Sequence, residues 1–536
     1  LRNAAQRRSW TFYETVNIRF LVISIRFDKN NLKMIPIKLT LAMSFKRMKP
    51  FWITAFAFGL VFVVLFCIRL DLYGKFSHKP PRAFFSSIDP PLERDSWMNI
   101  LQNGRKIGVS HTTFLRRKNG YLLKETLYMR INTMGLVQDI NLKTVGRLYP
   151  DFTLSSFDFN ISSGRFVFSA KGNVSGNVLS IKTHGLESTG SFNIKIPERV
   201  YLAAGIMNAV EASGLEPGEE VAFQIFDPST MASEPVSVRV IEHEEILNMG
   251  VKKKAKKIAM MFKGVTQLAW VGENGEVIKE KGFLGISLEK TTRDHALFDL
   301  PVESSQDLTM GVSVPSNVPI NNADTLTRLE VEISGISYDH LSLDGGRQSL
   351  NGNLLIINKE SVPDAPNDYD VTELKESQLK FLAPSLFIES NHPKIRDLVK
   401  KIVAADETPL KKTINLVDWI NKNIEKRPVI SLPDALAVIE NRAGDCNEHA
   451  VLLAALARAV GIPAKLEAGL VYLNGRFYYH AWNLLYLGKW ITVDSLFGQL
   501  PADVTHIRFS SGELKQQLDL ISVIGKLKLK VINYTK

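Results

Sequence analysis

Cys446, His480 and Asp494 are the residues of this 536-residue chain whose types and surroundings could together carry out nucleophilic chemistry. Asp445 is a good helix N-cap, and Glu448 three residues later completes an Asp-x-x-Glu version of the capping box. We therefore expect Cys446 in the first turn of a helix. The positive end of the helix dipole favours a thiolate at that position, which makes Cys446 a candidate nucleophile.

The helix that would present Cys446 has a clear end as well as a clear start. An Ala/Leu/Val run over residues 450–460 predicts a buried helix. Gly461 is placed to end it as the residue after the C-cap, and Pro463 prevents its continuation.

Strands downstream of this helix would carry the base and the carboxylate. We expect three strand-like runs, at residues 465–473, 476–486 and 490–494. Asn474-Gly475 between the first two is a strong type I′ hairpin signal, and a second turn lies near Leu487. If that turn is centred on Leu487, His480 lies directly opposite Asp494, and a shift of the turn makes them near-diagonal neighbours. A base and an orienting carboxylate on adjacent strands, with a thiol at a helix start, suit cysteine catalysis.

The segments around these residues resemble the transglutaminase-like family, part of the papain-like cysteine protease superfamily. The resemblance covers roughly residues 380–510. It lies in Gly-Asp-Cys446, Ala-Arg-Ala-Val-Gly-Ile-Pro463, Tyr-Tyr-His480-Ala-Trp482 and Trp490-Ile-Thr-Val-Asp494. The resemblance implies that Cys446 is the nucleophile, His480 the general base and acid, and Asp494 the orienting residue.

The sequence departs from the family pattern in two places. Asp494-Ser495 stands where the family usually has Asp-Pro, and Asn483-Leu484-Leu485 stands where it often has a glutamate. Neither departure replaces a residue of the triad, so both concern substrate preference more than activity.

Two other histidines compete for a role. His449 lies three residues after Cys446 on the same predicted helix, so its side chain would sit on the flank, with no carboxylate-bearing strand following it. His506 follows Pro501-Ala-Asp-Val-Thr, and we expect it to have a packing role. The ten histidines show no metal-ligand spacing, and we expect neither a metal nor another cofactor.

Charge and cysteine content narrow the classes of function. The net charge is +11, but residues 1–50 hold 11 Lys and Arg against Glu14 and Asp28, a balance of +9 that leaves only +2 for the rest. The basic character therefore belongs to one end of the chain and does not indicate a nucleic-acid partner. The only cysteines are Cys67 and Cys446, which leaves no pair for a disulfide after residue 70.

The N-terminal part predicts a membrane anchor. Residues 1–42 show no clear period, which indicates either disorder or an over-extended start, with Met43 or Met48 as the true one. Within residues 43–70, a basic flank precedes the uncharged stretch at 51–68, just long enough to span a bilayer. We expect a single-pass anchor, with a cleaved signal peptide as the alternative, and a catalytic domain outside the cytoplasm (periplasmic or extracellular). Residues 71–94 then form a Pro-rich spacer.

The rest of the chain predicts an α+β protein. We expect an antiparallel β-rich domain at 95–300, with one helix over residues 201–212, and a β-rich connecting region at 301–370. The lysine-rich run at residues 252–257 is typical of a solvated loop or a guarded strand edge. A papain-like, transglutaminase-like catalytic domain would then occupy 371–536. Its first helices are expected at residues 392–405 and 409–424.

Two functional hypotheses follow. The first is a membrane-anchored cysteine enzyme that acts on protein or peptide amides through a thioacyl intermediate, by hydrolysis or by acyl transfer. The second is a catalytically inactive binding or scaffolding protein at the cell envelope. The triad does not distinguish hydrolysis from cross-linking, because the first half-reaction is shared, and the oligomeric state stays open.

Overall fold

The computed structural model describes residues 93–536, except residues 165, 185–188, 198, 299, 301, 363–373 and 430–432. The predicted extension at 1–42, the predicted anchor at 51–68 and nearly all of the predicted spacer lie outside the described residues. Within the described ranges, no helix is both long and apolar enough to cross a membrane.

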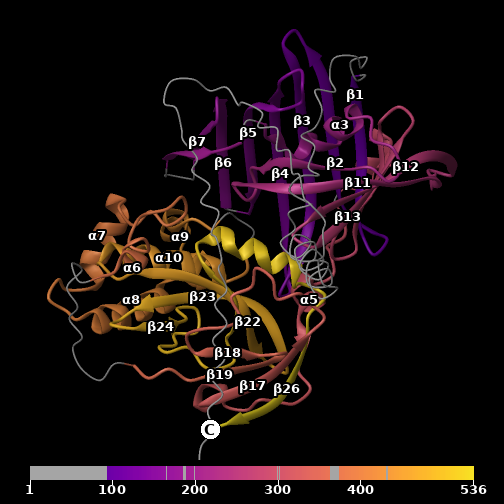
Figure 1. The fold of residues 1–536 in the computed structure, drawn as a ribbon. Coiled ribbons are helices and arrows are strands. Elements are labelled where there is room, and N and C mark those ends of the chain that lie inside the picture. Colours follow the sequence, from indigo (N-terminus) through magenta and orange to yellow (C-terminus); the bar gives the residue numbers. More distant parts are fainter. Residues whose placement is uncertain are drawn as a thin grey trace, which may run out of the picture. The chain divides into compact units, whose positions relative to one another are not determined.

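The β-rich region is one continuous sheet of fifteen strands (Figure 1). In chain order these are β1 (Arg94–Gln102), β2 (Arg105–Arg117), β3 (Gly120–Thr133), β4 (Leu136–Leu148), β5 (Leu154–Ser163), β6 (Phe166–Ser175), β7 (Val178–His184), β8 (Thr189–Lys195), β9 (Tyr201–Leu202), β10 (Glu220–Asp227), β11 (Ala232–Asn248), β12 (Val251–Phe262), β13 (Val265–Gly272), β14 (Val277–Lys281) and β15 (Ile286–Thr291). Neighbours along the sheet follow the order β8 to β1, then β15 to β9, and all pairs are antiparallel except β9 with β10. The predicted antiparallel β-rich character is thus confirmed.

The sheet curls back on itself. A bridge joins Thr153, directly before β5, to Tyr201 of β9, and the N–H of Leu154 donates to the carbonyl of Val200 at 2.8 Å. Strands β5 to β1 and β15 to β9 therefore form a ring, with β6, β7 and β8 extending from it. Alternating side chains of these strands face the inside of the ring.

The helix predicted over residues 201–212 is shorter than expected. Tyr201 and Leu202 form β9, which pairs in parallel with Ile225 and Phe226. A 3₁₀ turn, η2 (Ala203–Gly205), follows, and only α3 (Ile206–Ala212) is an α-helix. The start of the segment is a strand because ladder hydrogen bonds to β10 replace helical ones, a tertiary effect that local propensity does not contain.

The lysine-rich run lies in β12 and not in a loop. Residues 252–254 pair with β11 on one side only, as the predicted strand edge would, whereas residues 255–257 lie between β11 and β13. Opposite charges on β11 accompany this pairing: Lys257 contacts Glu242 and Glu244 at 3.2 Å each, and Lys252 lies 3.7 Å from Glu245.

The C-terminal region combines short helices with two further sheets (Figure 1). Its helices are α6 (Glu376–Leu379), α7 (Pro393–Ile402), α8 (Pro409–Asn423), α9 (Ala435–Asn441) and α10 (Cys446–Ala459). One sheet contains β16 (Val314–Pro315), β22 (Ala464–Leu473), β23 (Arg476–Tyr486), β24 (Trp490–Val493) and β25 (Ile507–Gly512), and the other contains β17 (Arg328–Ser334), β18 (Gln348–Asn351), β19 (Leu354–Asn358) and β26 (Lys528–Thr535). A short parallel pair joins β20 (Glu425–Lys426) to β21 (Ala443–Gly444). The helices predicted at 392–405 and 409–424 correspond to α7 and α8.

Helix α10 is the centre of this region. Its residues from Ala450 to Ala457 are all buried, and it packs against α7, α8, α9, β22 and β23. Burying so much apolar surface fixes the helix, and with it the position of Cys446 at its first turn.

Strands before residue 360 share sheets with strands after residue 460. β16 pairs with β23, and β17 pairs with the C-terminal strand β26. The division between a connecting region and a catalytic domain at residue 370 stays a prediction, and these pairings tie the two sides of it together.

Candidate active site

Cys446 is the first residue of α10, as the sequence predicts. The side chain of Asp445 accepts a hydrogen bond from the N–H of Asn447 at 2.9 Å, and Glu448 reaches back to the N–H of Asp445 at 3.1 Å. This is the predicted capping box. Gly461, with φ of 83°, follows the end of the helix as expected. Both ends of the helix that presents the thiol are therefore specified by local sequence.

The first hairpin is also as predicted. Asn474 and Gly475 both have positive φ, 50° and 84°, as a type I′ turn requires, and they join β22 to β23. The second turn is centred one residue later than Leu487, since Asn483 pairs with Val493 and Tyr486 with Trp490.

The shifted turn sets the relation between His480 and Asp494. Continuing the β23–β24 register by one residue places Asp494 opposite Trp482, so that His480 is its diagonal neighbour on the same face. The sequence had allowed two arrangements, directly opposite residues or diagonal neighbours, and the structure has the second. The side chains span the diagonal: Nε2 of His480 lies 2.6 Å from Oδ2 of Asp494, and both residues are buried.

The Nε2–Asp494 contact defines the task of the other ring nitrogen. With Nε2 occupied, Nδ1 of His480 is the atom that can exchange a proton with a thiol. Cys446 lies beside the same strand, since α10 packs against β23 and the backbone of Ala481, the residue after His480, is close enough to the sulfur to act on its pKa. Within the part of the chain that the structure describes, no hydrogen bond joins the Cys446 sulfur to the His480 ring itself. The structure thus joins two of the three predicted residues directly and places the third next to their strand.

Asp494 is held as a carboxylate from several sides. Oδ1 accepts from the backbone N–H groups of Leu496 and Phe497, at 2.7 and 3.0 Å, while Oδ2 contacts both His480 and His506. Burial alone would raise the pKa of Asp494, but the attraction of His480 and the hydrogen bonds from both histidines outweigh it and lower that pKa far below its ordinary value.

His506 is the residue of the site that sequence reasoning missed. Its Nε2 lies 3.0 Å from Oδ2 of Asp494, and its Nδ1 lies 3.3 Å from Oδ1 of Asp503. Burial opposes a charge on this ring, but the hydrogen bonds to the two carboxylates outweigh it and raise the pKa of His506. A ring that donates from both nitrogens is an imidazolium, so His506 supplies a buried positive charge behind Asp494. No local spacing signals this contact, because the loop after β24 creates it.

Aromatic rings enclose the base. The His480 ring stacks on Phe497, with centroids 5.0 Å apart, and lies 5.9 Å from Trp482 at an interplanar angle of 29°. Trp482 in turn donates from its indole nitrogen to Glu467 at 2.9 Å. These contacts fix the plane of the imidazole, which a catalytic base needs.

The Cys446 thiol does not have the lowered pKa that its helix position predicts. Burial raises the pKa of this thiol well above its ordinary value, and the neighbouring carboxylates, Asp445 first, raise it further against the opposing effect of the Ala481 backbone. Part of the residue nevertheless stays accessible to solvent. In this state the nucleophile is a neutral thiol, because desolvation and nearby negative charge outweigh the helix dipole.

His449 is placed as a structural residue. It is almost completely buried, and its Nδ1 lies 2.8 Å from the backbone carbonyl of Asp445, one turn back on α10. Burial lowers its pKa. That His449 is not the base stays a prediction.

The site also contains a group of side chains that could hold a metal ion. Ligand atoms of His480, Asp494 and His506 all lie within 4.8 Å of one another. This proximity brings together histidines that have no metal-ligand spacing in the sequence. The three side chains lie close together because Nε2 of His480 and Nε2 of His506 both contact Oδ2 of Asp494. These contacts account for the arrangement without a metal ion.

Solved structures that are similar to this chain include two proposed proteases and one barrel. A proposed cysteine protease from Cytophaga hutchinsonii is 19% identical, with a TM-score of 0.26, over 39% of this chain and 86% of that one. A β-barrel-like protein from Brucella abortus, a domain of unknown function, is 10% identical, with a TM-score of 0.30, over 38% of this chain and 98% of that one. A proposed protease from Parabacteroides distasonis is 9% identical, with a TM-score of 0.20, over 68% of each chain. All three TM-scores are too low to establish a common fold.

A comparison with curated proteins found no significant match. The comparison with protein families did: residues 396–495 match the family described as the transglutaminase-like superfamily. The match begins within α7 and ends just after Asp494, so it includes Cys446 and His480. The segment that carries Cys446, His480 and Asp494 is thus similar to the transglutaminase-like superfamily.

Proposed function

We propose that this protein is a transglutaminase-like cysteine enzyme that acts on protein or peptide amides through Cys446, His480 and Asp494. The observation that carries the proposal is the 2.6 Å contact between Nε2 of His480 and Oδ2 of Asp494. It leaves Nδ1 as the proton acceptor on the strand next to the helix that presents the thiol. A histidine oriented by a carboxylate beside a cysteine is the arrangement that nucleophilic catalysis uses.

The neutral thiol decides how the reaction begins. As Sγ of Cys446 attacks the carbonyl carbon of the amide, its proton passes to Nδ1 of His480, and a C–S bond forms while the carbonyl oxygen becomes an oxyanion. The N–H of Cys446 has no acceptor within its helix and is suited to stabilise that oxyanion. His480 then returns the proton to the leaving nitrogen as the C–N bond breaks.

The second half-reaction sets the product. The thioester is attacked by water or by an amine, which gives its proton to His480 as the new bond forms, and the proton then returns to the sulfur of Cys446 as the C–S bond breaks. Water gives a shortened peptide or a deamidated side chain, and a lysine amine gives a cross-link.

The cellular location that we propose for this activity follows from the N-terminal sequence. The uncharged residues 51–68 would anchor the protein in a membrane with its catalytic part outside the cytoplasm, where protein or peptide substrates would reach it. Loss of the protein from the membrane fraction when residues 51–68 are deleted checks this, and unchanged fractionation would contradict it.

The test is to incubate the full chain with a peptide library, with and without an amine donor, and to identify products by mass. Cys446→Ala should lower turnover about 10⁴-fold or more, since it removes the nucleophile, and His480→Ala should be nearly as damaging. His449→Ala should retain activity if it folds, which circular dichroism checks. The assignment is wrong if folded His449→Ala is inactive while His480→Ala still turns over.

The alternative, an inactive binding or scaffolding protein, makes the opposite prediction for the thiol. In the enzyme, labelling of Cys446 by iodoacetamide at neutral pH depends on His480 as proton acceptor. If His480→Ala leaves the rate of Cys446 labelling unchanged, the enzyme loses its chemical basis and the scaffolding function replaces it.

A further inference from the structure

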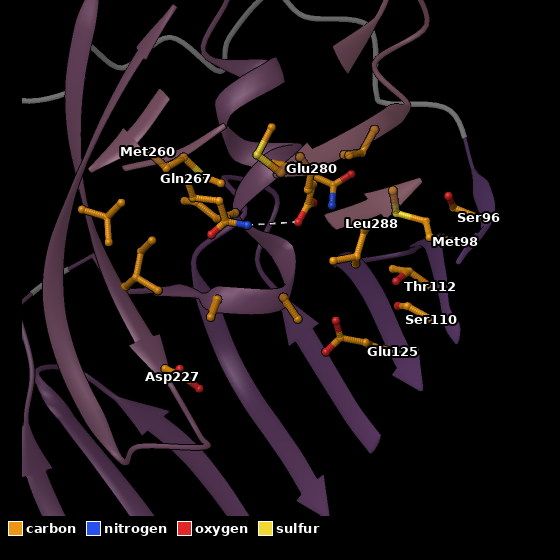
Figure 2. Close-up of a pocket in the computed structure, with 18 of the residues that line it drawn as sticks. Ser96, Met98, Ser110, Thr112, Glu125, Asp227, Met260, Gln267, Glu280 and Leu288 are labelled. Carbon is orange, nitrogen blue, oxygen red and sulfur yellow. Dashed lines mark hydrogen bonds between the residues drawn. The ribbon is translucent and has the colours of Figure 1, made fainter. Parts of the chain in front are cut away.

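The ring of strands in the β-rich region encloses a cavity of about 720 Å³ (Figure 2). Its wall follows strand alternation: on β2, Ser110, Thr112 and Phe114 line it, while the residues between them do not. Apolar side chains cover much of it, among them Met98 and Leu288. A cavity of this volume lies within the range of small-molecule sites.

Acidic side chains project into this cavity from strands that are far apart in the sheet. Figure 2 shows Glu125 of β3, Glu280 of β14 and Asp227 at the end of β10 on its inner surface. Three strands, β2, β1 and β15, separate β3 from β14 in the sheet order. Glu125 and Glu280 nevertheless repel each other electrostatically, so they face each other through the interior and not along the sheet.

These carboxyl groups have weak partners. Glu280 accepts one hydrogen bond, from Nε2 of Gln267 at 3.1 Å, and Glu125 is hydrogen-bonded by Thr144. Asp227 accepts from Ser229 at 2.7 and 2.8 Å. In the described parts of the chain, none of the three acids forms an ion pair.

The cations of the cavity wall are engaged elsewhere. Among the described residues, seven acidic side chains and two basic ones, Arg94 and Lys290, line the cavity. Of the acids, Asp95 contacts His111 and Glu234 lies 3.7 Å from Lys263. Arg94 forms an ion pair with Glu211 at 2.6 Å, and Lys290 is attracted by Glu276. The interior near Glu125 and Glu280 therefore lacks a compensating positive charge.

An uncompensated pair of carboxyl groups inside a closed sheet is costly. Burial, and then the charge of Glu125, raise the pKa of Glu280 to about 7, and burial also raises the pKa of Glu125. Apolar residues at the same positions would fill such an interior at lower cost. Acidic residues at interior positions that apolar residues would fill at lower cost indicate a functional site.

Glu125, Glu280 and Asp227 do not together form a three-ligand metal site. Among the described residues, the only group of three or more side chains that could hold one metal ion is that of His480, Asp494 and His506. A cation that suits both Glu125 and Glu280 and the apolar wall carries an aliphatic part beside its charged group.

We propose that this cavity binds an organic cation, whose ammonium group lies against the carboxylates of Glu125 and Glu280 and whose aliphatic part packs against Met98, Met260 and Leu288. An ammonium group offers several N–H donors to the acceptor-only carboxylates, and the aliphatic part removes apolar surface from water. This site does not depend on the function proposed for Cys446.

Isothermal titration of the full chain with n-octylammonium and with n-octanoate tests the charge, because the two probes share chain length and differ in sign. The expected result is binding of octylammonium at least 10-fold tighter than octanoate. Glu280→Gln and Glu125→Gln should each weaken octylammonium binding about 10-fold, which corresponds to about 1.4 kcal/mol. Glu289→Gln is the matched control: Glu289 lies outside the cavity on β15, 2.7 Å from Lys279, and its loss should leave the affinity unchanged.

Glu280→Lys gives an independent measurement. A tethered ammonium beside Glu125 should fold and should abolish octylammonium binding. Equal affinity for the two probes, or no effect of Glu280→Gln and Glu280→Lys, would overturn the proposal. Calcium binding that Glu280→Gln removes would also overturn it, because the site would then be a metal site.

Discussion

Asp494 in the candidate active site is buried and Glu280 in the strand ring is partly buried, but the pKa values of the two carboxyl groups shift in opposite directions. The pKa of Asp494 is lowered far below its ordinary value, while that of Glu280 is raised from 4.5 to about 7. Burial penalises the charge of both. The difference lies in their partners, since Asp494 is contacted by two histidines and two backbone N–H groups, and Glu280 by one neutral amide.

This difference separates a site that is complete from one that lacks a component. The Asp494 network contains its own cation, the His506 ring, so the charge of Asp494 is already balanced before substrate arrives. The acids of the strand ring are balanced only by protonation or by a cation from outside the chain. The same physical rule therefore supports a catalytic role for one carboxylate and a binding role for the other.

The largest effect that distinguishes the two carboxylates is expected for Asp494→Ala. Without the carboxylate, His480 loses its orientation and the buried charge of His506 loses a partner. We expect activity to fall about 10³- to 10⁴-fold, but to remain measurable, because Asp494 orients the base without exchanging protons. Loss of one partner from a buried charge network should also lower the free energy of unfolding by about 3–5 kcal/mol.

Asp503→Ala is the matched control for that change, since Asp503 contacts His506 but not His480. Steady-state kinetics and denaturant unfolding of both variants make the comparison. If Asp494→Ala loses no more activity than Asp503→Ala, Asp494 does not orient the base.

A smaller effect is expected for His506→Gln, which keeps a hydrogen-bond donor near Asp494 but removes the charge. The lowered pKa of Asp494 stabilises the folded state above the ordinary value of 3.8, and this stability is lost as pH falls through the lowered pKa. Removing the cation raises the folded-state pKa of Asp494. Acid inactivation should therefore begin at a higher pH, with kcat/KM near neutral pH reduced about 10-fold, or about 1.4 kcal/mol. A pH profile identical to that of the unchanged protein would show that His506 has only the packing role expected from the sequence.

The sequence was most informative where the chemistry depends on local chain geometry. The capping box around Asp445, the Gly461 end of α10 and the Asn474-Gly475 turn each act over a few residues, and each appears in the structure. The contact between His480 and Asp494 was predictable to within one turn position, because a shift of the turn still left the two side chains on one face.

The rest depends on contacts that no local pattern encodes. His506 reaches Asp494 through the loop after β24, and burial of Cys446 reverses the pKa expected at a helix start. The raised pKa of Glu280 requires knowing that β3 and β14 face one interior. Residues that share a cavity through the closure of a sheet are separated by arbitrary lengths of sequence, so their electrostatics follow only from the assembled fold.

An effect of the opposite sign, on stability alone, is expected for Glu280→Gln. The folded-state pKa of Glu280, about 7, exceeds the ordinary value of 4.5, so the folded protein retains a proton that the unfolded chain releases. Stability associated with this proton is therefore complete below pH 4.5 and is lost as pH rises through about 7. The groups that face Glu280 in the cavity are Glu125 and Gln267, neither of which supplies a positive charge. A shift of this size corresponds to at most about 3 kcal/mol, and less where water reaches the cavity.

Glu280→Gln should thus raise the free energy of unfolding by about 1–3 kcal/mol at pH 8 and change it little at pH 4.5, as measured by denaturant unfolding at both pH values. Glu289→Gln, outside the cavity, should stay within about 0.5 kcal/mol at both. A Glu280→Gln variant that is less stable at pH 8 than the unchanged protein would show that the carboxylate of Glu280 is compensated within the fold, and would remove its contrast with Asp494.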